Sequence, residues 1–126
     1  MSVILDASAI LAMLFDEPGG EQIFGKAHKG LLSAVNLTEV IAKCVVRGID
    51  YSLVERQLSR LDITIVSFVA EDARMAAELV PHTRRWGLSL ADRACLALAL
   101  KRNLAVWTAD HAWAECDLGI DIRLIR

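Results

Sequence analysis

Near its amino terminus the chain reads Val3-Ile4-Leu5-Asp6-Ala7-Ser8-Ala9. The apolar, partly β-branched residues 3–5 predict a buried strand, and the apolar stretch Ala7–Phe15 predicts a helix that follows it directly. Asp6 therefore stands at the carboxyl end of a strand and at the start of a helix. In open α/β sheets, functional groups gather where the chain leaves the carboxyl ends of strands. The stretch thus predicts the fold class and marks the edge of the sheet where a site is expected.

The rest of the chain continues the alternation of short strands with longer helices. Further helices are predicted from the break at residues 18–20 to about Lys29, and at Ala34–Arg47, Tyr51–Arg60, Ala70–Arg84 and Leu90–Lys101. Further strands are predicted at Gly30–Leu32, Ile63–Ser67, Ala105–Thr108 and Ile122–Ile125. Strands separated by helices indicate a mostly parallel sheet that helices cover on both faces. Since no repeat or linker interrupts the pattern, one compact α/β domain over residues 1–126 is expected.

The composition is typical of a folded protein with an aliphatic core. Hydrophobic residues make up 55% of the 126 residues, and aromatic residues only 6%. The formal net charge of −2 at first argues against a nucleic-acid partner. If four of the 16 acidic residues hold a cation, however, 12 remain against 14 lysines and arginines, a balance of +2. The net charge therefore decides neither for nor against a nucleic-acid partner.

The cysteines and the apolar runs predict a soluble cytoplasmic protein with no membrane partner. Cys44, Cys95 and Cys116 are odd in number, form no Cys-x-x-Cys pair and fall in predicted helical segments, so buried reduced thiols are expected. The longest apolar runs, near residues 9–15 and 94–100, are shorter than the ~20 residues of a membrane-spanning helix. No basic stretch precedes the first apolar run, so no signal peptide is predicted.

Four carboxylates occupy positions where a structural role would suffice for each one. Asp6 and Asp110 follow predicted strands and precede helical segments, so either side chain is a candidate helix cap. Asp92 lies three residues after a serine, which matches a capping box. Glu39 lies four residues before Lys43 on one predicted helix, a spacing that allows an exposed ion pair worth roughly a few tenths of a kcal/mol.

Taken together, the positions of these carboxylates indicate a metal site. Asp6 and Asp110 both follow strands, and the carboxyl ends of parallel strands open onto one edge of a sheet. Asp92 begins a helix that is apolar all round and is therefore expected to be buried. Carboxylates within a few ångströms raise one another's pKa unless a cation neutralises them. Oxygen ligands without His or Cys suit Mg²⁺, or Mn²⁺ as a substitute, better than zinc.

Four segments of the chain resemble, in order, the motifs of the PIN domain family. They are residues 3–9, Asn36-Leu37-Thr38-Glu39-Val40, Leu90-Ala91-Asp92 and Thr108-Ala109-Asp110. Any one segment is common, but the ordered set spans nearly the whole chain with appropriate spacing. Within the family the chain looks most like the VapC toxins. The resemblance implies a three-layer α/β/α sandwich, an acidic pocket for Mg²⁺ or Mn²⁺, and endonucleolytic hydrolysis of RNA by a metal-activated water.

The resemblance also implies a role for each matching residue. The acidic positions of the family, which imply catalytic residues, correspond to Asp6, Glu39, Asp92 and Asp110. Of these, Asp6, Asp92 and Asp110 are the implied metal ligands, although the last acidic position is the most variable in the family and Asp117 is a nearby competitor. Glu39 is expected to ligate directly, to act through water, or to help deprotonate the nucleophile. Ser8, Asn36 and Thr108 match polar positions expected to orient carboxylates or waters.

Arginines near Asp92 are candidates for holding RNA. Arg84 and Arg85 precede the helix that carries Asp92, and Arg93 follows it directly, so all three are candidate phosphate contacts. A solvated loop and an exposed helix residue explain them equally well. The histidines, His28, His82 and His111, fit no nucleophile–base arrangement and are expected at the surface. Trp107 and Trp113 are expected in the core or an interface.

The resemblance further implies a homodimer and inhibition by a small antitoxin whose tail docks in a hydrophobic groove. The apolar excess of the helix Ala7–Phe15 is compatible with such a surface, and equally with core burial. Two alternatives within the family stay open: a nuclease of RNA processing without an antitoxin, and an inactive binding scaffold. A receiver domain is disfavoured because the last lysine is Lys101, and a haloacid-dehalogenase-type phosphatase because Ser8 stands where a second Asp is needed.

Overall fold

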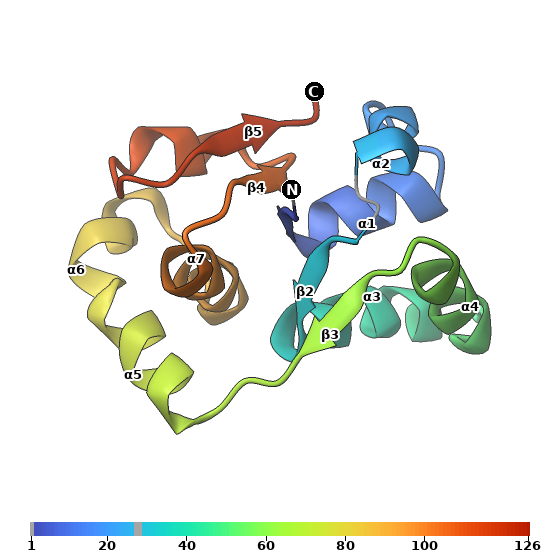
Figure 1. Ribbon diagram of the computed structural model, residues 1–126, viewed down its shortest axis with the longest axis horizontal. Coiled ribbons are helices and arrows are strands. Elements are labelled where there is room, and N and C mark those ends of the chain that lie inside the picture. The colour runs from blue at the N-terminus through green and yellow to red at the C-terminus, as the bar shows by residue number, and fades with distance from the viewer. Residues whose placement is uncertain (1, 27–28) are drawn as a thin grey trace.

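A computed structural model of the chain describes residues 2–26 and 29–126. Within these residues a five-stranded sheet crosses the centre of the molecule, and every strand pair is parallel (Figure 1). In spatial order the strands are β3 (Thr64–Val66), β2 (Leu31–Ser33), β1 (Ile4–Leu5), β4 (Val106–Thr108) and β5 (Ile122–Leu124). The predicted α/β fold with a mostly parallel central sheet is therefore confirmed.

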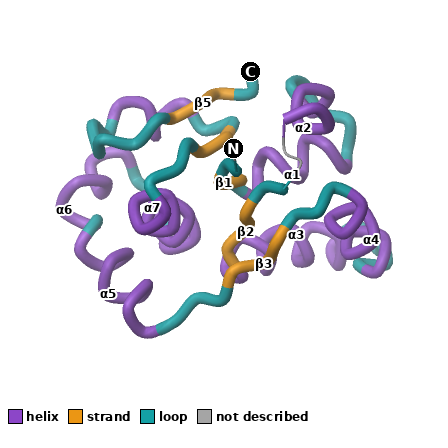
Figure 2. The backbone as a smooth tube through the Cα atoms, in the orientation of Figure 1, coloured by secondary structure: helices purple, strands orange, loops and turns teal. Residues whose placement is uncertain are grey.

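Helices pack on both sides of this sheet (Figure 2). The α-helices are α1 (Ala7–Leu14), α2 (Gly20–Lys26), α3 (Ala34–Val46), α4 (Ser52–Arg60), α5 (Ala70–Glu78), α6 (Val80–Thr83) and α7 (Leu90–Arg102). Two short 3₁₀ helices are η1 (Arg84–Trp86) and η2 (His111–Glu115). In Figure 1, α1–α4 lie on one side of the central strands and α5–α7 on the other.

The two successive residues of β1, Ile4 and Leu5, contribute to two separate hydrophobic cores. Leu5 packs with buried residues of α1, α3 and α4, among them Ile10, Val40 and Val54. Its neighbour Ile4 packs with the buried residues of α5 and α7. Successive side chains of a strand point to opposite faces, so one strand feeds both cores. The architecture is the three-layer α/β/α sandwich that the resemblance implied.

The predicted helix Ala70–Arg84 is wrong as a single element. The chain forms α5, then α6, then the 3₁₀ helix η1 over this range. Pro81 lies in the first turn of α6 and explains the interruption. Its ring has no N–H to donate and would clash with the carbonyl four residues earlier, so a continuous helix cannot pass through it. Other predicted boundaries lie within three residues of the observed ones. Residues 27–28 of the second predicted helix lie outside the described part.

Ser33 determines where α3 begins. Its side chain caps the helix, because Oγ accepts a hydrogen bond from the Val35 N–H at 3.2 Å. The start of the helix directly after β2 places Asn36 and Glu39 in its first two turns, beside the carboxyl edge of the sheet. At the far end, Gly48 adopts a φ of +69° and stops the helix at Val46, within one residue of the predicted end at Arg47.

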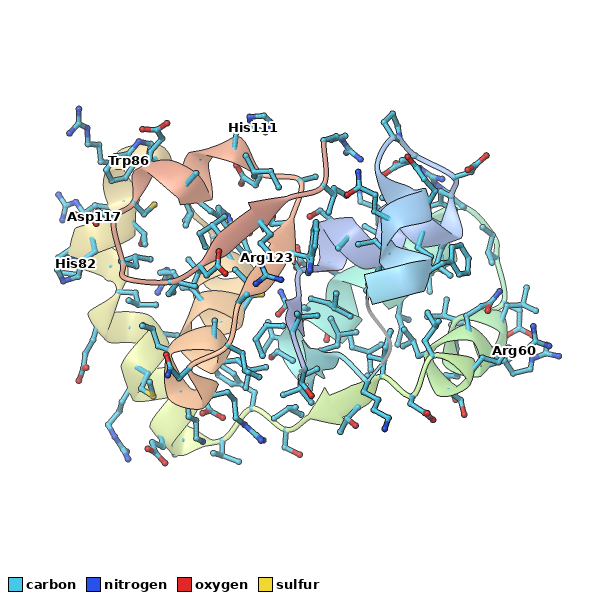
Figure 3. The ribbon with its side chains drawn as sticks, turned by 45° about the horizontal axis from the view of Figure 1, so that its top comes forward. Arg60, His82, Trp86, His111, Asp117 and Arg123 are labelled. Atoms are coloured by element: carbon cyan, nitrogen blue, oxygen red, sulfur yellow. The ribbon has the colours of Figure 1, made fainter. Side chains whose placement is uncertain are left out.

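The expectations for cysteine, tryptophan and histidine are confirmed within the described residues. The three cysteines are free and buried. Trp107 and Trp113 lie in the core. His82 and His111 are exposed, as Figure 3 shows, whereas His28 lies outside the described residues. No helix within residues 2–26 and 29–126 is long and apolar enough to cross a membrane.

Two glycines of α2 differ in their surroundings and provide a matched test of the packing between α1 and α2. A Cβ at Gly20 would lie 2.2 Å from the Ala12 carbonyl oxygen, whereas a Cβ at Gly25 would meet nothing within 4 Å. Gly20→Ala is expected to lower the free energy of unfolding by about 1–3 kcal/mol through overpacking. Gly25→Ala is expected to leave it unchanged or raise it by up to about 1 kcal/mol. Urea denaturation measures both, and equal effects would contradict the close approach.

Candidate active site

The site lies where the strand order of the sheet reverses. From β1 the chain adds β2 and then β3 on one side, whereas β4 and β5 lie on the other side of β1. Such a switch point leaves a crevice beyond the carboxyl ends of the two central strands. Asp6 follows β1, and its N–H donates to the Trp107 carbonyl of β4 at 3.0 Å. Asp6 and Thr108 therefore meet at the predicted edge.

Two hydroxyl groups hold the Asp6 carboxylate. Oδ2 accepts hydrogen bonds from Ser8 Oγ at 2.6 Å and from Thr108 Oγ1 at 2.9 Å. Asp6 occupies the N-cap position of α1, but its side chain makes no capping hydrogen bond. The capping alternative for Asp6 is therefore wrong. Ser8 Oγ also accepts from the Ala109 N–H at 2.9 Å, so the hydroxyl pair ties α1 to the loop after β4.

Asp92 has a structural role that does not use all of its side chain. Ser89 Oγ accepts from the Asp92 N–H at 3.2 Å, and Asp92 Oδ2 accepts from the Ser89 N–H at 2.8 Å. The predicted capping box is therefore confirmed. A carboxylate has two oxygens, so the cap fixes the orientation of Asp92 while Oδ1 is not needed for it. The helix that follows is buried on nearly all sides, as predicted.

Glu39 approaches the same edge from α3. Its Oε1 accepts a hydrogen bond from Asn36 Nδ2 at 3.1 Å, one helical turn earlier. The same Nδ2 donates to the Ala91 carbonyl at 3.0 Å, next to Asp92 in the chain. The amide therefore joins α3 to α7 at the site.

Burial and mutual repulsion raise the pKa values of two of these carboxyl groups. Burial raises the pKa of Asp6 from 3.8 to about 6; the hydroxyls of Ser8 and Thr108 oppose the rise, and the charges of Asp92 and Glu39 add to it. Burial also raises the pKa of Glu39, and the charge of Asp92 adds to it against the opposing effect of Asn36. The structure therefore brings Asp6, Glu39 and Asp92 within electrostatic reach of one another.

Asp110 takes a different position from these three. Its Oδ1 accepts from the Ala112 N–H at 3.0 Å and so caps η2. Its own N–H donates to Thr108 Oγ1 at 3.0 Å, which keeps its backbone next to the hydroxyl that holds Asp6. The capping alternative predicted for Asp110 is confirmed. Its competitor Asp117 is exposed and projects from the end of the molecule that also carries His82 and Trp86 (Figure 3).

Cys95 belongs to the site and was not predicted there. Its thiol is fully buried, and burial raises its pKa well above the usual range, with the charges of Asp6, Asp92 and Glu39 adding to the effect. The thiol is therefore a neutral group close to all three carboxylates. One local signal pointed to it: residues three apart on a helix share a face, and Cys95 follows Asp92 by three.

The donor set of the site suits a hard cation, although the carboxylates do not close on one by themselves. All of the side chains gathered here offer oxygen except the neutral thiol of Cys95. Within the described residues, no three His, Cys, Asp or Glu side chains are close enough together to hold a metal ion. Mg²⁺ usually binds through one or two carboxylates and keeps several waters, so a closed set of three is not required. The chemistry of the residues fits Mg²⁺ or Mn²⁺ on that basis.

The three predicted RNA contacts differ in what they touch. Arg84 and Arg85 are exposed on η1, and the Arg85 guanidinium lies 5.2 Å from the centre of the Trp86 ring. Arg93, however, donates through Nη1 to the Ala76 carbonyl of α5 at 3.1 Å. The Arg93 side chain therefore extends along α5, and this hydrogen bond takes part of its donor capacity.

The sequence model of the PIN domain family matches residues 3–118. The chain therefore belongs to the PIN domain family. A comparison with curated protein sequences finds no match.

Solved structures share the fold over nearly their whole length. A DNA-bound VapBC from Salmonella typhimurium has a TM-score of 0.73 at 17% identity, over 100% of this chain and 99% of that one. A toxin–antitoxin complex from Klebsiella pneumoniae has a TM-score of 0.71 at 19% identity, over 98% of each chain. VapC20 from Mycobacterium tuberculosis, described as a sarcin–ricin loop cleaving toxin, has a TM-score of 0.72 at 18% identity, over 91% of this chain and 95% of that one.

The raised pKa of Asp6 predicts how the stability of the metal-free protein changes with pH. The folded state binds the Asp6 proton more tightly than the unfolded state does, so stability is lost as pH rises from about 4 through 6. A rise from 3.8 to about 6 corresponds to about 3 kcal/mol. Relative to Asp6→Asn, the wild type is expected to lose up to that amount between pH 4 and 7. Urea denaturation in EDTA measures the difference, and a difference that is constant with pH would contradict the prediction.

Proposed function

We propose that this protein is a Mg²⁺-dependent endoribonuclease that acts as the toxin of a toxin–antitoxin pair. The observation that carries the proposal is the convergence of Asp6, Glu39 and Asp92, from three separate elements, at the switch point of a parallel sheet. Burial raises the pKa values of Asp6 and Glu39, and the negative charges of the neighbouring carboxylates add to the rise. A folded protein that keeps such repulsion in its interior gains from a cation that relieves it.

Family and fold support the choice of RNA and of the toxin role. The chain belongs to the PIN domain family, and proteins of the same fold include VapBC complexes and a sarcin–ricin loop cleaving toxin. These relatives are under 20% identical to the chain, so their partners and substrates enter here as part of the proposal.

Asp6 and Asp92 are the proposed direct ligands of Mg²⁺ or Mn²⁺. Asp110 is a third ligand in the proposal, and its Oδ1 is already engaged in capping η2. When bound, the cation supplies Lewis acidity, which lowers the pKa of a water and polarises a phosphoryl oxygen. Ser8 and Thr108 keep Asp6 in one orientation through the two hydrogen bonds to Oδ2. The donors are preorganised, so the carboxylate need not move to bind the cation.

Glu39 is the proposed proton acceptor for the attacking water. It is half-buried, and its pKa is raised above the ordinary value. A base whose pKa lies nearer to the working pH takes up a proton from water more effectively. Arg84 and Arg85, exposed just before α7, are the proposed contacts for RNA phosphates. Arg93 contributes less in this scheme because of its hydrogen bond to Ala76.

An open apolar cavity offers a place for the antitoxin in this proposal. The cavity, of ≈ 480 Å³, lies between the end of α1 and α4, and its lining includes Leu14, Phe15, Leu53, Arg56 and Arg60. Figure 3 shows Arg60 projecting outward at one end of the molecule, opposite the end that carries His82 and Trp86. Apolar walls with two arginines suit an amphipathic segment that carries acidic residues. A homodimer in the cytoplasm is the proposed resting form of the toxin.

Cleavage assays test the nuclease directly. Purified protein is expected to cut single-stranded RNA, and not matched DNA, in Mg²⁺ or Mn²⁺, and to lose the activity in EDTA. Asp6→Asn and Asp92→Asn are each expected to reduce the rate at least about 100-fold, because each removes a proposed ligand. Asp110→Asn is expected to reduce it about 10-fold, since that carboxylate already serves as a cap.

Asp117→Asn provides the charge-matched control, because this acidic residue is exposed and lies away from the carboxylate cluster. Its cleavage rate is expected to equal that of the wild type. If folded wild-type protein, free of bound inhibitor, cuts no RNA with either cation, the inactive scaffold becomes the better interpretation.

Co-expression tests the antitoxin. Leu53 is half-exposed in the cavity, so Leu53→Arg is expected to prevent co-purification with the small protein encoded directly upstream, while RNA cleavage is retained. Leu100→Arg, at an exposed leucine of α7 outside this cavity, is the control and is expected to retain the partner. If no small protein with a DNA-binding amino terminus is encoded there, a nuclease of RNA processing is favoured.

A further inference from the structure

Asn36 is a fully buried amide at the junction of α3 and α7. Its side chain is 0% exposed. Nδ2 donates to Glu39 Oε1 at 3.1 Å within α3 and to the Ala91 carbonyl at 3.0 Å in α7. One side chain thus joins the carboxylate of one helix to the backbone beside the carboxylate of the other.

The partners determine which way the amide points. Both Glu39 Oε1 and the Ala91 carbonyl only accept hydrogen bonds, so the NH₂ group of Asn36 must face both of them. Its two hydrogens are then used, one for each partner. Oδ1 faces away from both acceptors and, within the described residues, finds no donor although it is buried.

Neither helix needs this amide to begin where it does. Ser33 already caps α3, and the Ser89–Asp92 capping box already begins α7. An apolar side chain of similar volume would fill the same space without the unpaired Oδ1. An unpaired buried acceptor costs stability, so the apolar side chain would avoid that cost. The two donated hydrogen bonds are therefore what the amide contributes.

Those two hydrogen bonds act against an electrostatic force at the site. The charge of Asp92 raises the pKa of Glu39, while the Asn36 hydrogen bond lowers it. The carboxylates of α3 and α7 therefore repel each other, and Asn36 bridges the two helices at the point of repulsion.

We propose that Asn36 is a positioning residue that holds Glu39 in register with Asp92 by clamping α3 to α7 through Ala91. The role rests on the proposed nuclease function, since the register matters only if both carboxylates serve one reaction. Asn36 touches neither substrate nor metal in this scheme and acts through Glu39.

Three variants of the full chain test the clamp. Asn36→Leu keeps the volume and removes both donors, whereas Asn36→Thr keeps one hydroxyl donor that can serve only one of the two acceptors. Thr83→Val is the control: it removes a buried hydrogen bond, from Thr83 Oγ1 to the Leu79 carbonyl at 2.8 Å, on the distant helix α6. Thr83→Val and Asn36→Thr are expected to lower the melting temperature because each loses a buried hydrogen bond. Asn36→Leu, which also removes the unpaired Oδ1, is expected to keep a melting temperature close to that of the wild type.

Only the Asn36 variants are expected to change the site. In Asn36→Leu, kcat for RNA cleavage is expected to fall about 10- to 100-fold with KM within about twofold, and Mn²⁺ affinity measured by calorimetry to fall about 10-fold. Asn36→Thr is expected to lie between Asn36→Leu and the wild type, and Thr83→Val to match the wild type in both quantities. An Asn36→Leu protein with wild-type kcat and Mn²⁺ affinity would overturn the proposal.

Crystal structures of the metal-free wild type and Asn36→Leu separate this proposal from the proposed function. In Asn36→Leu the Glu39 carboxylate is expected to move away from the Ala91 carbonyl. An unchanged position of that carboxylate would overturn the proposed role of Asn36. Absence of RNA cleavage by the wild type would instead overturn the nuclease function, whatever position Glu39 takes in the variant.

Discussion

The rest of the site depends on one buried carboxylate at the centre of the sheet. Asp6 is 5% exposed, and among the described residues the hydroxyls of Ser8 and Thr108 offset the loss of water around it. Ser8 is only two residues from Asp6 in the chain, whereas Thr108 comes from β4, so β1 and β4 must pair in register for Thr108 to reach Oδ2. The two hydrophobic cores on either face of β1 hold that register. The packing of the two cores therefore also determines the orientation of the Asp6 carboxylate.

Each neighbouring carboxylate is held by a different device. Asp92 is fixed by the cap of its own helix, Glu39 by an amide one turn earlier, and Asp110 by the cap of η2. Asp92 and Asp110 therefore each combine the capping of a helix with a proposed role in the site. The neutral thiol of Cys95 lies close to Asp6, Glu39 and Asp92 and adds no charge of its own. The resulting arrangement concentrates negative charge at a partly buried site, where a cation is attracted more strongly than in water.

The sequence predicted the features that depend on near neighbours in the chain. The junction of strand and helix at Asp6, the capping box at Asp92 and the end of α3 at Gly48 all follow from local patterns, and all are observed. The break at Pro81 also follows from a local rule, the missing N–H of proline, although a single helix was predicted through it. The bond from Asn36 to Ala91 was not predictable in this way. It joins residues 55 apart, and it depends on the angle at which α3 crosses α7, which no local pattern specifies.

The double use of Asp92 has an evolutionary consequence. Its carboxylate caps α7 whatever else it does, so a lineage released from selection on the site would still be favoured to keep an acid there. Asp6 has no such second use, because its side chain caps no helix and its burial disfavours the charged carboxylate, as the raised pKa shows. Drift in descendants that have lost the reaction would therefore erase Asp6 early and Asp92 late. The order in which acidic residues disappear from these two positions would therefore show whether the site or the helix cap was lost first.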